Sequence, residues 1–142
     1  MGLFAGEELV PPKKRILYID DKIEMISLTR IFLRQKGFEV LGALGGTQGL
    51  ETIKQEKPDL VLLDLVMPGM SGWEVYEKMQ ADTEMARIPV IFVSASARDL
   101  SLEAKWRGMS SVVDTIAKPF APRALVEIIK RVFAQTDGPQ FV

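Results

Sequence analysis

Short apolar segments alternate along this chain with segments in which apolar residues recur at helical spacing. The apolar segments have the length of strands and are rich in β-branched residues. This alternation is typical of βαβ units, in which helices cover a sheet of parallel strands. We therefore predict five strands, which cover residues 16–20, 38–44, 60–64, 89–94 and 112–117.

The segments between these strands predict helices. The expected helices cover residues 24–36, 47–57, 73–81 and 99–107, and a closing helix begins near Pro122. Gly37 and Pro58 stand where a helix should end. The order (βα)5 predicts a flavodoxin-like, doubly wound α/β sandwich with strand order 2-1-3-4-5. We expect a flexible leader at 1–12, one domain at 13–135 and a short tail at 136–142.

The composition of the chain excludes several classes of function. The chain has 142 residues and a net charge of −1, so no basic surface attracts nucleic acid or an anionic membrane. No apolar run approaches the roughly 18 residues that span a bilayer. Cysteine and histidine are absent, which excludes disulfides, Ser-His-Asp catalysis, thiolate or imidazole metal ligands and a phosphohistidine within the chain. The lack of cysteine fits a reducing compartment, and we expect a cytoplasmic protein.

Chemically reactive residues follow four of the predicted strands. They are Asp20 with Asp21, Asp64, Ser94 and Lys118. Parallel strands end at the same edge of a sheet, where doubly wound proteins bind their ligands. Strand order 2-1-3-4-5 makes the first and third strands neighbours, so we expect Asp20, Asp21 and Asp64 to lie together.

Three carboxylates, a hydroxyl and an ammonium group suit a divalent cation and a phosphoryl group. Carboxylates repel one another unless a cation such as Mg²⁺ binds between them. Asp64 is the expected nucleophile, because it ends the central strand before a glycine-containing loop. Lys118 would neutralise one phosphoryl oxygen, and the Ser94 hydroxyl would donate to another.

Each of these residues taken alone has an ordinary structural explanation. A single acidic residue at a strand end is usually a turn or helix cap, and a single lysine is usually surface charge. Glycines at 42, 45, 46 and 49 match no phosphate-binding motif and indicate turns and tight packing. The functional hypothesis therefore depends on the co-occurrence of these residues at successive strand ends.

Four segments resemble the response-regulator receiver domain of two-component signalling, in the manner of a single-domain chemotaxis regulator. They are Ile19–Asp21, Asp64–Gly72, Val93–Ala95 and Lys118–Phe120. The resemblance covers residues 14–135 and implies that a histidine kinase or phosphotransfer protein phosphorylates Asp64. It also implies that Asp20 or Asp21, Asp64 and the main-chain carbonyl of Val66 bind Mg²⁺, and that the Lys118–Pro119 peptide is cis.

The resemblance further implies a two-state switch. Phosphorylation would draw Ser94 inward and rearrange the face made by the helix at 99–107, the fifth strand and the closing helix, which then binds a downstream protein. Two features depart from the family pattern. Thr115 replaces the usual aromatic switch residue, and the stretch at 108–118 is about three residues longer than is usual in the family.

Three alternatives stay open. An aspartyl-phosphate hydrolase would share the nucleophile and Mg²⁺, but such enzymes carry D-x-D, whereas Asp20 and Asp21 are adjacent. A flavodoxin-like cofactor protein would need a phosphate loop, which the sequence lacks. A receiver that signals by protein binding without phosphorylation is favoured slightly by Thr115. The sequence does not predict the partner kinase, the downstream target or the oligomeric state.

Overall fold

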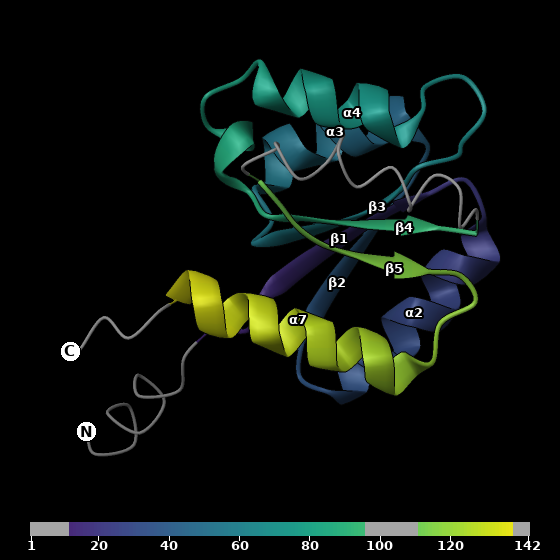
Figure 1. Cartoon of the computed structure of the whole chain (residues 1–142), viewed down its shortest axis with the longest axis vertical. Coiled ribbons are helices and arrows are strands. Elements are labelled where there is room, and N and C mark those ends of the chain that lie inside the picture. The colour runs from purple at the N-terminus through teal and green to yellow at the C-terminus, as the bar shows by residue number, and fades with distance from the viewer. Residues whose placement is uncertain (1–11, 96–110, 138–142) are drawn as a thin grey trace.

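The computed structural model describes residues 12–95 and 111–137, and these form a sheet with helices on both faces (Figure 1). The sheet has five parallel strands in the order β2-β1-β3-β4-β5, which confirms the predicted flavodoxin-like topology. The strands are β1 (Arg15–Asp20), β2 (Glu39–Leu44), β3 (Leu60–Asp64), β4 (Val90–Ser94) and β5 (Val112–Ala117). The predicted helix at 99–107 and nearly all of the predicted leader lie outside the described residues.

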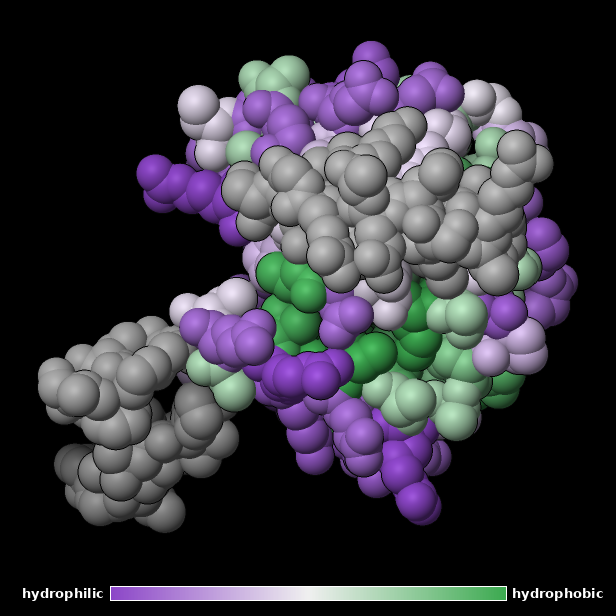
Figure 2. All heavy atoms as spheres, viewed as in Figure 1, coloured by the Kyte–Doolittle hydropathy of each residue, from purple (hydrophilic) through white to green (hydrophobic). Residues whose placement is uncertain are grey.

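Helices α2 (Ile23–Gln35) and α7 (Pro122–Asp137) cover one face of the sheet. Helices α3 (Gly46–Glu56) and α4 (Gly72–Gln80) cover the other face, and a 3₁₀ turn, η1 (Met85–Arg87), follows α4 (Figure 1). Hydrophilic and apolar residues both appear along α7 in Figure 2, and the exposed residues of this helix include Arg123, Glu127 and Lys130. Among the described residues, no helix has both the length and the apolar character needed to cross a membrane.

The two faces of the sheet carry separate hydrophobic cores. Tyr18, Leu62 and Val93 belong to the core under α2 and α7, whereas Leu17, Leu63 and Phe92 belong to the core under α3 and α4. All residues of β3 are buried, as a continuous apolar run predicts for a strand covered on both faces. Burying one such large side chain contributes about 1.5–3 kcal/mol.

The observed helices match the predicted ones to within one or two residues at their starts, and the differences have local causes. Helix α4 begins at Gly72 because Ser71 caps it, accepting a hydrogen bond from the Glu74 N–H while the Glu74 side chain accepts one from the Ser71 N–H. A Cβ atom at Gly72 would lie 2.8 Å from Leu65 Cα, so only glycine lets α4 start this close to the end of β3. Helix α7 continues through Asp137, into the segment predicted as a tail.

Strand β5 contains an irregularity in its pairing with β4. Val90 pairs with Val112, but the next residue, Ile91, pairs with Asp114. Val113 is therefore an extra residue in β5, as in a β-bulge. The bulge lies within the stretch at 108–118 that we expect to be longer than is usual in the family.

Candidate functional site

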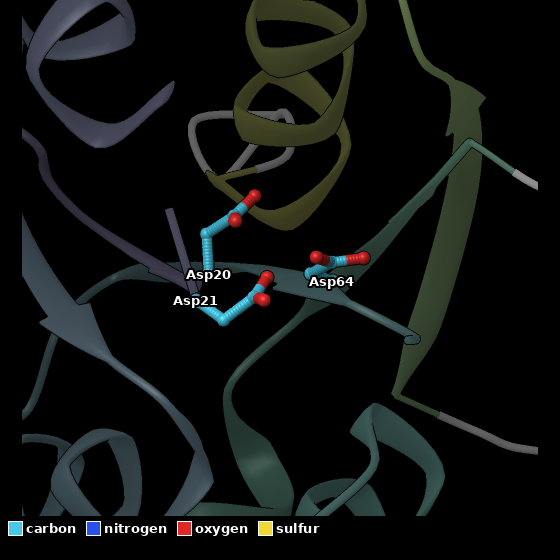
Figure 3. Close-up of side chains that lie close together, drawn as sticks. All are labelled: Asp20, Asp21 and Asp64. Carbon is cyan, nitrogen blue, oxygen red and sulfur yellow. The ribbon is translucent and has the colours of Figure 1, made fainter. Parts of the chain in front are cut away.

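The ends of β1 and β3 bring three carboxyl groups together. Asp20 is the last residue of β1, Asp21 follows it, and Asp64 is the last residue of β3. One carboxylate oxygen of each lies within 4.8 Å of the others, and Figure 3 shows the three side chains grouped at this edge of the sheet. The predicted clustering of these residues at the switch point of the topology is confirmed.

Lys118 brings a positive charge to the same place from the end of β5. Its Nζ atom lies 2.6 Å from Asp20 Oδ2 and 3.2 Å from Asp64 Oδ2. The lysine side chain is only 13% exposed, so these contacts are shielded from water. Burial disfavours the ammonium ion, but the hydrogen bond to Asp20 and the two negative charges outweigh burial and raise the pKa of Lys118.

Asp20 is fully buried and is held by three donors. Besides Lys118, the Tyr18 hydroxyl donates to Oδ2 at 2.7 Å and the Lys22 N–H donates to Oδ1 at 2.9 Å. Burial acts to raise the pKa of Asp20, but the hydrogen bonds from Lys118, Tyr18 and the Lys22 N–H together lower it. Asp20 is therefore a fixed anion at the back of the site.

Tyr18 is a site residue that the sequence interpretation missed. It lies two positions before Asp20 on the same strand, and residues two apart on a strand point to the same face. This spacing could have indicated that the Tyr18 side chain lies beside that of Asp20. The Tyr18 hydroxyl donates a hydrogen bond to Asp20, and the ring is completely buried in the core.

Asp64 is the carboxylate that faces the opening of the site. Its side chain is about 5% exposed, and its Oδ1 accepts a hydrogen bond of 3.3 Å from the Val66 N–H. Burial, and next the charge of Asp20, raise the pKa of the Asp64 carboxyl, and Lys118 opposes this only in part. Asp64 thus carries negative charge that its surroundings do not fully compensate.

A cavity of about 300 Å³ opens in front of Asp64. The residues that line it are Lys22, Asp64, Val66, Ala95 and Lys118. Two lysines and one carboxylate at a concave surface favour an anionic group placed against Asp64. Val66 is 59% exposed at the mouth of the cavity, where it faces solvent.

The two predicted switch residues, Ser94 and Thr115, lie on the neighbouring strands β4 and β5. Ser94 ends β4 and is fully buried, and its main-chain oxygen accepts a hydrogen bond of 2.8 Å from the Lys118 N–H. Thr115 pairs with Phe92 across the β4–β5 ladder, and Phe92 packs edge-on against Trp73 at 4.7 Å between ring centroids. The Lys118–Pro119 peptide bond is cis, as the resemblance implied.

The carboxylate cluster fits a hard divalent cation. Asp21 Oδ1 is buried and has no hydrogen-bond partner among the described residues. A buried carboxylate oxygen left unpaired is costly, and a metal ion would satisfy it. Oxygen ligands without histidine or cysteine select cations such as Mg²⁺, so Asp20, Asp21 and Asp64 can supply ligands of the correct kind.

The fold and the site define a class of protein: a doubly wound α/β domain with an acidic site and a lysine at the carboxyl ends of its strands. The family model for the response regulator receiver domain matches residues 16–130. The chain therefore belongs to the response-regulator receiver domains of two-component systems, which are signalling domains.

Similar proteins support this family membership. The chain is 37% identical over 121 residues to the protein PilH of Pseudomonas aeruginosa, a match that covers 84% of this chain and 98% of PilH. It is 33% identical over 125 residues to the DNA-binding response regulator MtrA of Mycobacterium tuberculosis, covering 88% of this chain and 53% of MtrA. The chain thus spans about half the length of MtrA and nearly all of PilH.

Solved structures show the same fold. A CheY-like response regulator receiver domain protein from Methanospirillum hungatei superimposes with a TM-score of 0.77 and is 29% identical. That match covers 89% of this chain and 98% of the other. The likeness therefore extends over the whole receiver domain rather than over a local motif.

Proposed function

We propose that residues 13–135 of this chain form a receiver domain that accepts a phosphoryl group on Asp64. The donor would be a histidine kinase or a phosphotransfer protein, and the reaction would depend on Mg²⁺. A cytoplasmic location accords with such partners. The main support is the position of Lys118, whose ammonium group contacts both Asp20 and Asp64 beside an open cavity.

The chemistry follows from the arrangement of charges. An oxygen of Asp64 attacks the phosphorus of the donor's phosphohistidine, and a new O–P bond forms as the P–N bond breaks. The electron pair of the P–N bond stays with the imidazole, which takes a proton from solvent. Phosphoryl transfer needs positioning and charge neutralisation more than covalent assistance, and Lys118 supplies a fixed positive charge next to the acceptor.

The metal ion would be held by Asp20 or Asp21 together with Asp64 and the main-chain carbonyl of Val66. Bound there, it would offset the repulsion between the carboxylates and the phosphoryl oxygens. The chain itself fixes the acceptor, since the Val66 N–H and Lys118 each hold one oxygen of Asp64. Tyr18 and the Lys22 N–H keep Asp20 in place without occupying Asp64.

The output would be a change in protein binding at the face that includes β5 and α7. Ser94 would donate its hydroxyl to the phosphoryl group, and its movement would be felt in β5 through the hydrogen bond from the Lys118 N–H. Helix α7 exposes charged residues that include Arg123, Glu127 and Lys130, which suits a partner that binds reversibly. Because this change in binding would pass the signal on, the partner at this face would be a downstream protein.

Thr115 favours a second candidate, in which the receiver binds its partner without phosphorylation. In most receivers an aromatic ring at this position changes orientation on activation, whereas Thr115 is half-buried and has no ring to move. This candidate keeps the same face as its binding surface. It differs in predicting that partner affinity is the same for Asp64→Asn and for the phosphorylated protein.

The test is labelling by a small phosphodonor. Purified protein is incubated with acetyl phosphate and Mg²⁺, and the intact mass is measured. We expect the wild type to gain one phosphoryl group and Asp64→Asn to gain none. Asp59→Asn is the matched control, since Asp59 precedes the same strand at the opposite end of the sheet and its carboxylate is exposed. An unlabelled wild type, or a labelled Asp64→Asn, would refute the acceptor assignment.

A further inference from the structure

Lys22 is a second lysine at the site, and the family resemblance gives it no role. It follows Asp21 and lines the cavity in front of Asp64 together with Lys118. Its main-chain N–H donates to Asp20 Oδ1, so its backbone is fixed at the edge of the site. The side chain, by contrast, is 63% exposed. Lys22 therefore combines a main chain that is hydrogen-bonded to Asp20 with a side-chain charge that is largely exposed to solvent.

Helix stability does not explain a lysine at this position. Lys22 is the N-cap residue of α2 and makes no side-chain capping hydrogen bond. N-cap positions favour Ser, Thr, Asp and Asn, whose oxygens accept from the first helical N–H groups. A lysine also places a positive charge at the positive end of the helix dipole. The residue is therefore unfavourable for the helix, and helix stability gives no reason for its charge.

The charge of Lys22 pairs with the third carboxylate of the site. Lys22 Nζ lies 3.6 Å from Asp21 Oδ2. Asp21 is the carboxylate that Lys118 does not contact, because Lys118 pairs with Asp20 and Asp64. The two lysines thus divide the three carboxylates between them. Lys118, at 13% exposure, is a fixed partner, whereas Lys22 holds Asp21 only by a solvent-exposed contact that is easily broken.

We propose that Lys22 is a displaceable counter-ion that occupies Asp21 until Mg²⁺ binds there and then turns to the oxygens of the incoming phosphoryl group. The inference rests on the proposed function and adds a positioning residue to it. Lys22 is suited to both positions, since it contacts Asp21 and also lines the cavity that would receive the phosphoryl group. Its lysine ammonium is a compact charge on a flexible stem, which suits movement between two anions.

This role predicts two effects of opposite direction when the charge is removed. In Lys22→Gln, Mg²⁺ no longer competes with an ammonium group for Asp21, so metal affinity should rise by about two- to fivefold. The anionic phosphodonor loses one attractive charge at the mouth of the cavity, so labelling at saturating Mg²⁺ should slow by about two- to fivefold. Both effects should shrink as salt is raised, because the Lys22 side chain is exposed.

The experiment measures the two effects separately on the full chain. Mg²⁺ affinity is measured by isothermal titration calorimetry without any phosphodonor, and the labelling rate is measured with acetyl phosphate at saturating Mg²⁺. Lys22→Arg retains the charge and should stay close to the wild type in both assays. Lys57→Gln is the matched control, because Lys57 forms a similarly exposed ion pair with Glu84, at 3.8 Å, and the substitution changes the net charge equally.

The pair of results decides the proposal. Tighter Mg²⁺ binding together with slower labelling in Lys22→Gln, and neither change in Lys57→Gln, supports it. Unchanged or weaker Mg²⁺ binding overturns it, as does tighter binding with an unchanged labelling rate. Equal changes in Lys57→Gln would show a general charge effect and would also overturn it. If the wild type itself is not labelled, the proposed function fails, while the calorimetry still decides whether Lys22 competes with Mg²⁺.

Discussion

Lys118 Nζ lies 2.6 Å from Asp20 Oδ2, although 98 positions separate the two residues in the chain. The contact joins the edge strand β5 to the end of β1 across two intervening strands. Because Asp20 is fully buried and Lys118 nearly so, this pair couples the stability of the domain to the chemistry of its site.

Removing the lysine should therefore destabilise the metal-free protein. Lys118→Met leaves Asp20 and Asp64 without their shared cation, and breaking a buried ion pair on one side costs about 3 kcal/mol. Urea unfolding in the presence of a chelator measures the change. The double variant Asp20→Asn/Lys118→Met should recover much of the loss, since it removes the uncompensated charge. A Lys118→Met protein as stable as the wild type would contradict the coupling.

Asp21 should affect metal binding more than folding. Asp21→Asn removes a carboxylate from a crowded cluster, so the free energy of unfolding without metal should stay the same or rise by up to about 1 kcal/mol. Mg²⁺ affinity, measured by calorimetry, should fall by about tenfold or more. Glu77→Gln, which removes an exposed carboxylate from α4, serves as the control and should change neither quantity. Equal Mg²⁺ affinity in Asp21→Asn and the wild type would argue against Asp21 as a ligand.

Tyr18 should make the domain sensitive to alkaline pH. Burial, and next its hydrogen bond to Asp20, raise the pKa of Tyr18 above its ordinary value of 10.0, because ionisation would place two buried negative charges together. A raised pKa in the folded state stabilises the fold below pH 10, and that contribution is lost as the pH rises further. Lys118, whose pKa is also raised, adds the same trend.

Urea unfolding between pH 8 and pH 11 tests this with Tyr18→Phe. At pH 8 the variant should be less stable by about 1.5 kcal/mol, because Asp20 loses a donor. Above pH 10 its stability should fall less steeply than that of the wild type, since one buried ionisable group is gone. Tyr76→Phe is a control at pH 8, because the Tyr76 hydroxyl is buried without a partner among the described residues and has no hydrogen bond to lose. Parallel curves for Tyr18→Phe and the wild type would count against this account.

Gly72 should be needed to hold α4 against the end of β3. In Gly72→Ala the new methyl group would press on the Asp64 carbonyl and on Leu65 Cα, which are backbone atoms that cannot turn away. We expect a loss of about 1–3 kcal/mol in unfolding free energy, measured with urea. Ser71→Ala, which removes only the cap of α4, should cost about 1 kcal/mol and leave the position of Asp64 unchanged. An unfolding free energy in Gly72→Ala equal to that of the wild type would contradict this prediction, because it would show that α4 can move away from the end of β3.

Much of the fold could be predicted from the sequence because its strongest signals are hydrophobic patterns that extend over whole strands and helices. The run Leu60–Leu63 is apolar throughout, which indicates a strand buried on both faces, and the structure confirms it. Once the strands are in parallel order, the residues that follow them must meet at one edge. The proximity of Asp20, Asp21, Asp64 and Lys118 therefore followed from topology, without knowledge of any side-chain conformation.

Other features depend on single side chains and were not predictable in this way. The role of Tyr18 was hidden because a tyrosine in an apolar strand is normally part of the core, as its ring is here. The contact between Lys22 and Asp21 depends on the rotamer of an exposed lysine, and no periodic pattern reports that. The extra residue at Val113 was visible only as additional length, because the position of a bulge is decided by pairing with β4.

The most direct test of the central claim is an NMR titration with beryllofluoride, which mimics a phosphoryl group on a carboxylate, carried out at a fixed, saturating concentration of Mg²⁺. If the four strand ends form one phosphoryl-acceptor site, the amide resonances of Asp20, Asp64, Ser94 and Lys118 should shift together in the wild type and stay unchanged in Asp64→Asn. A wild-type spectrum without shifts at these residues, or the same shifts in Asp64→Asn, would contradict the account.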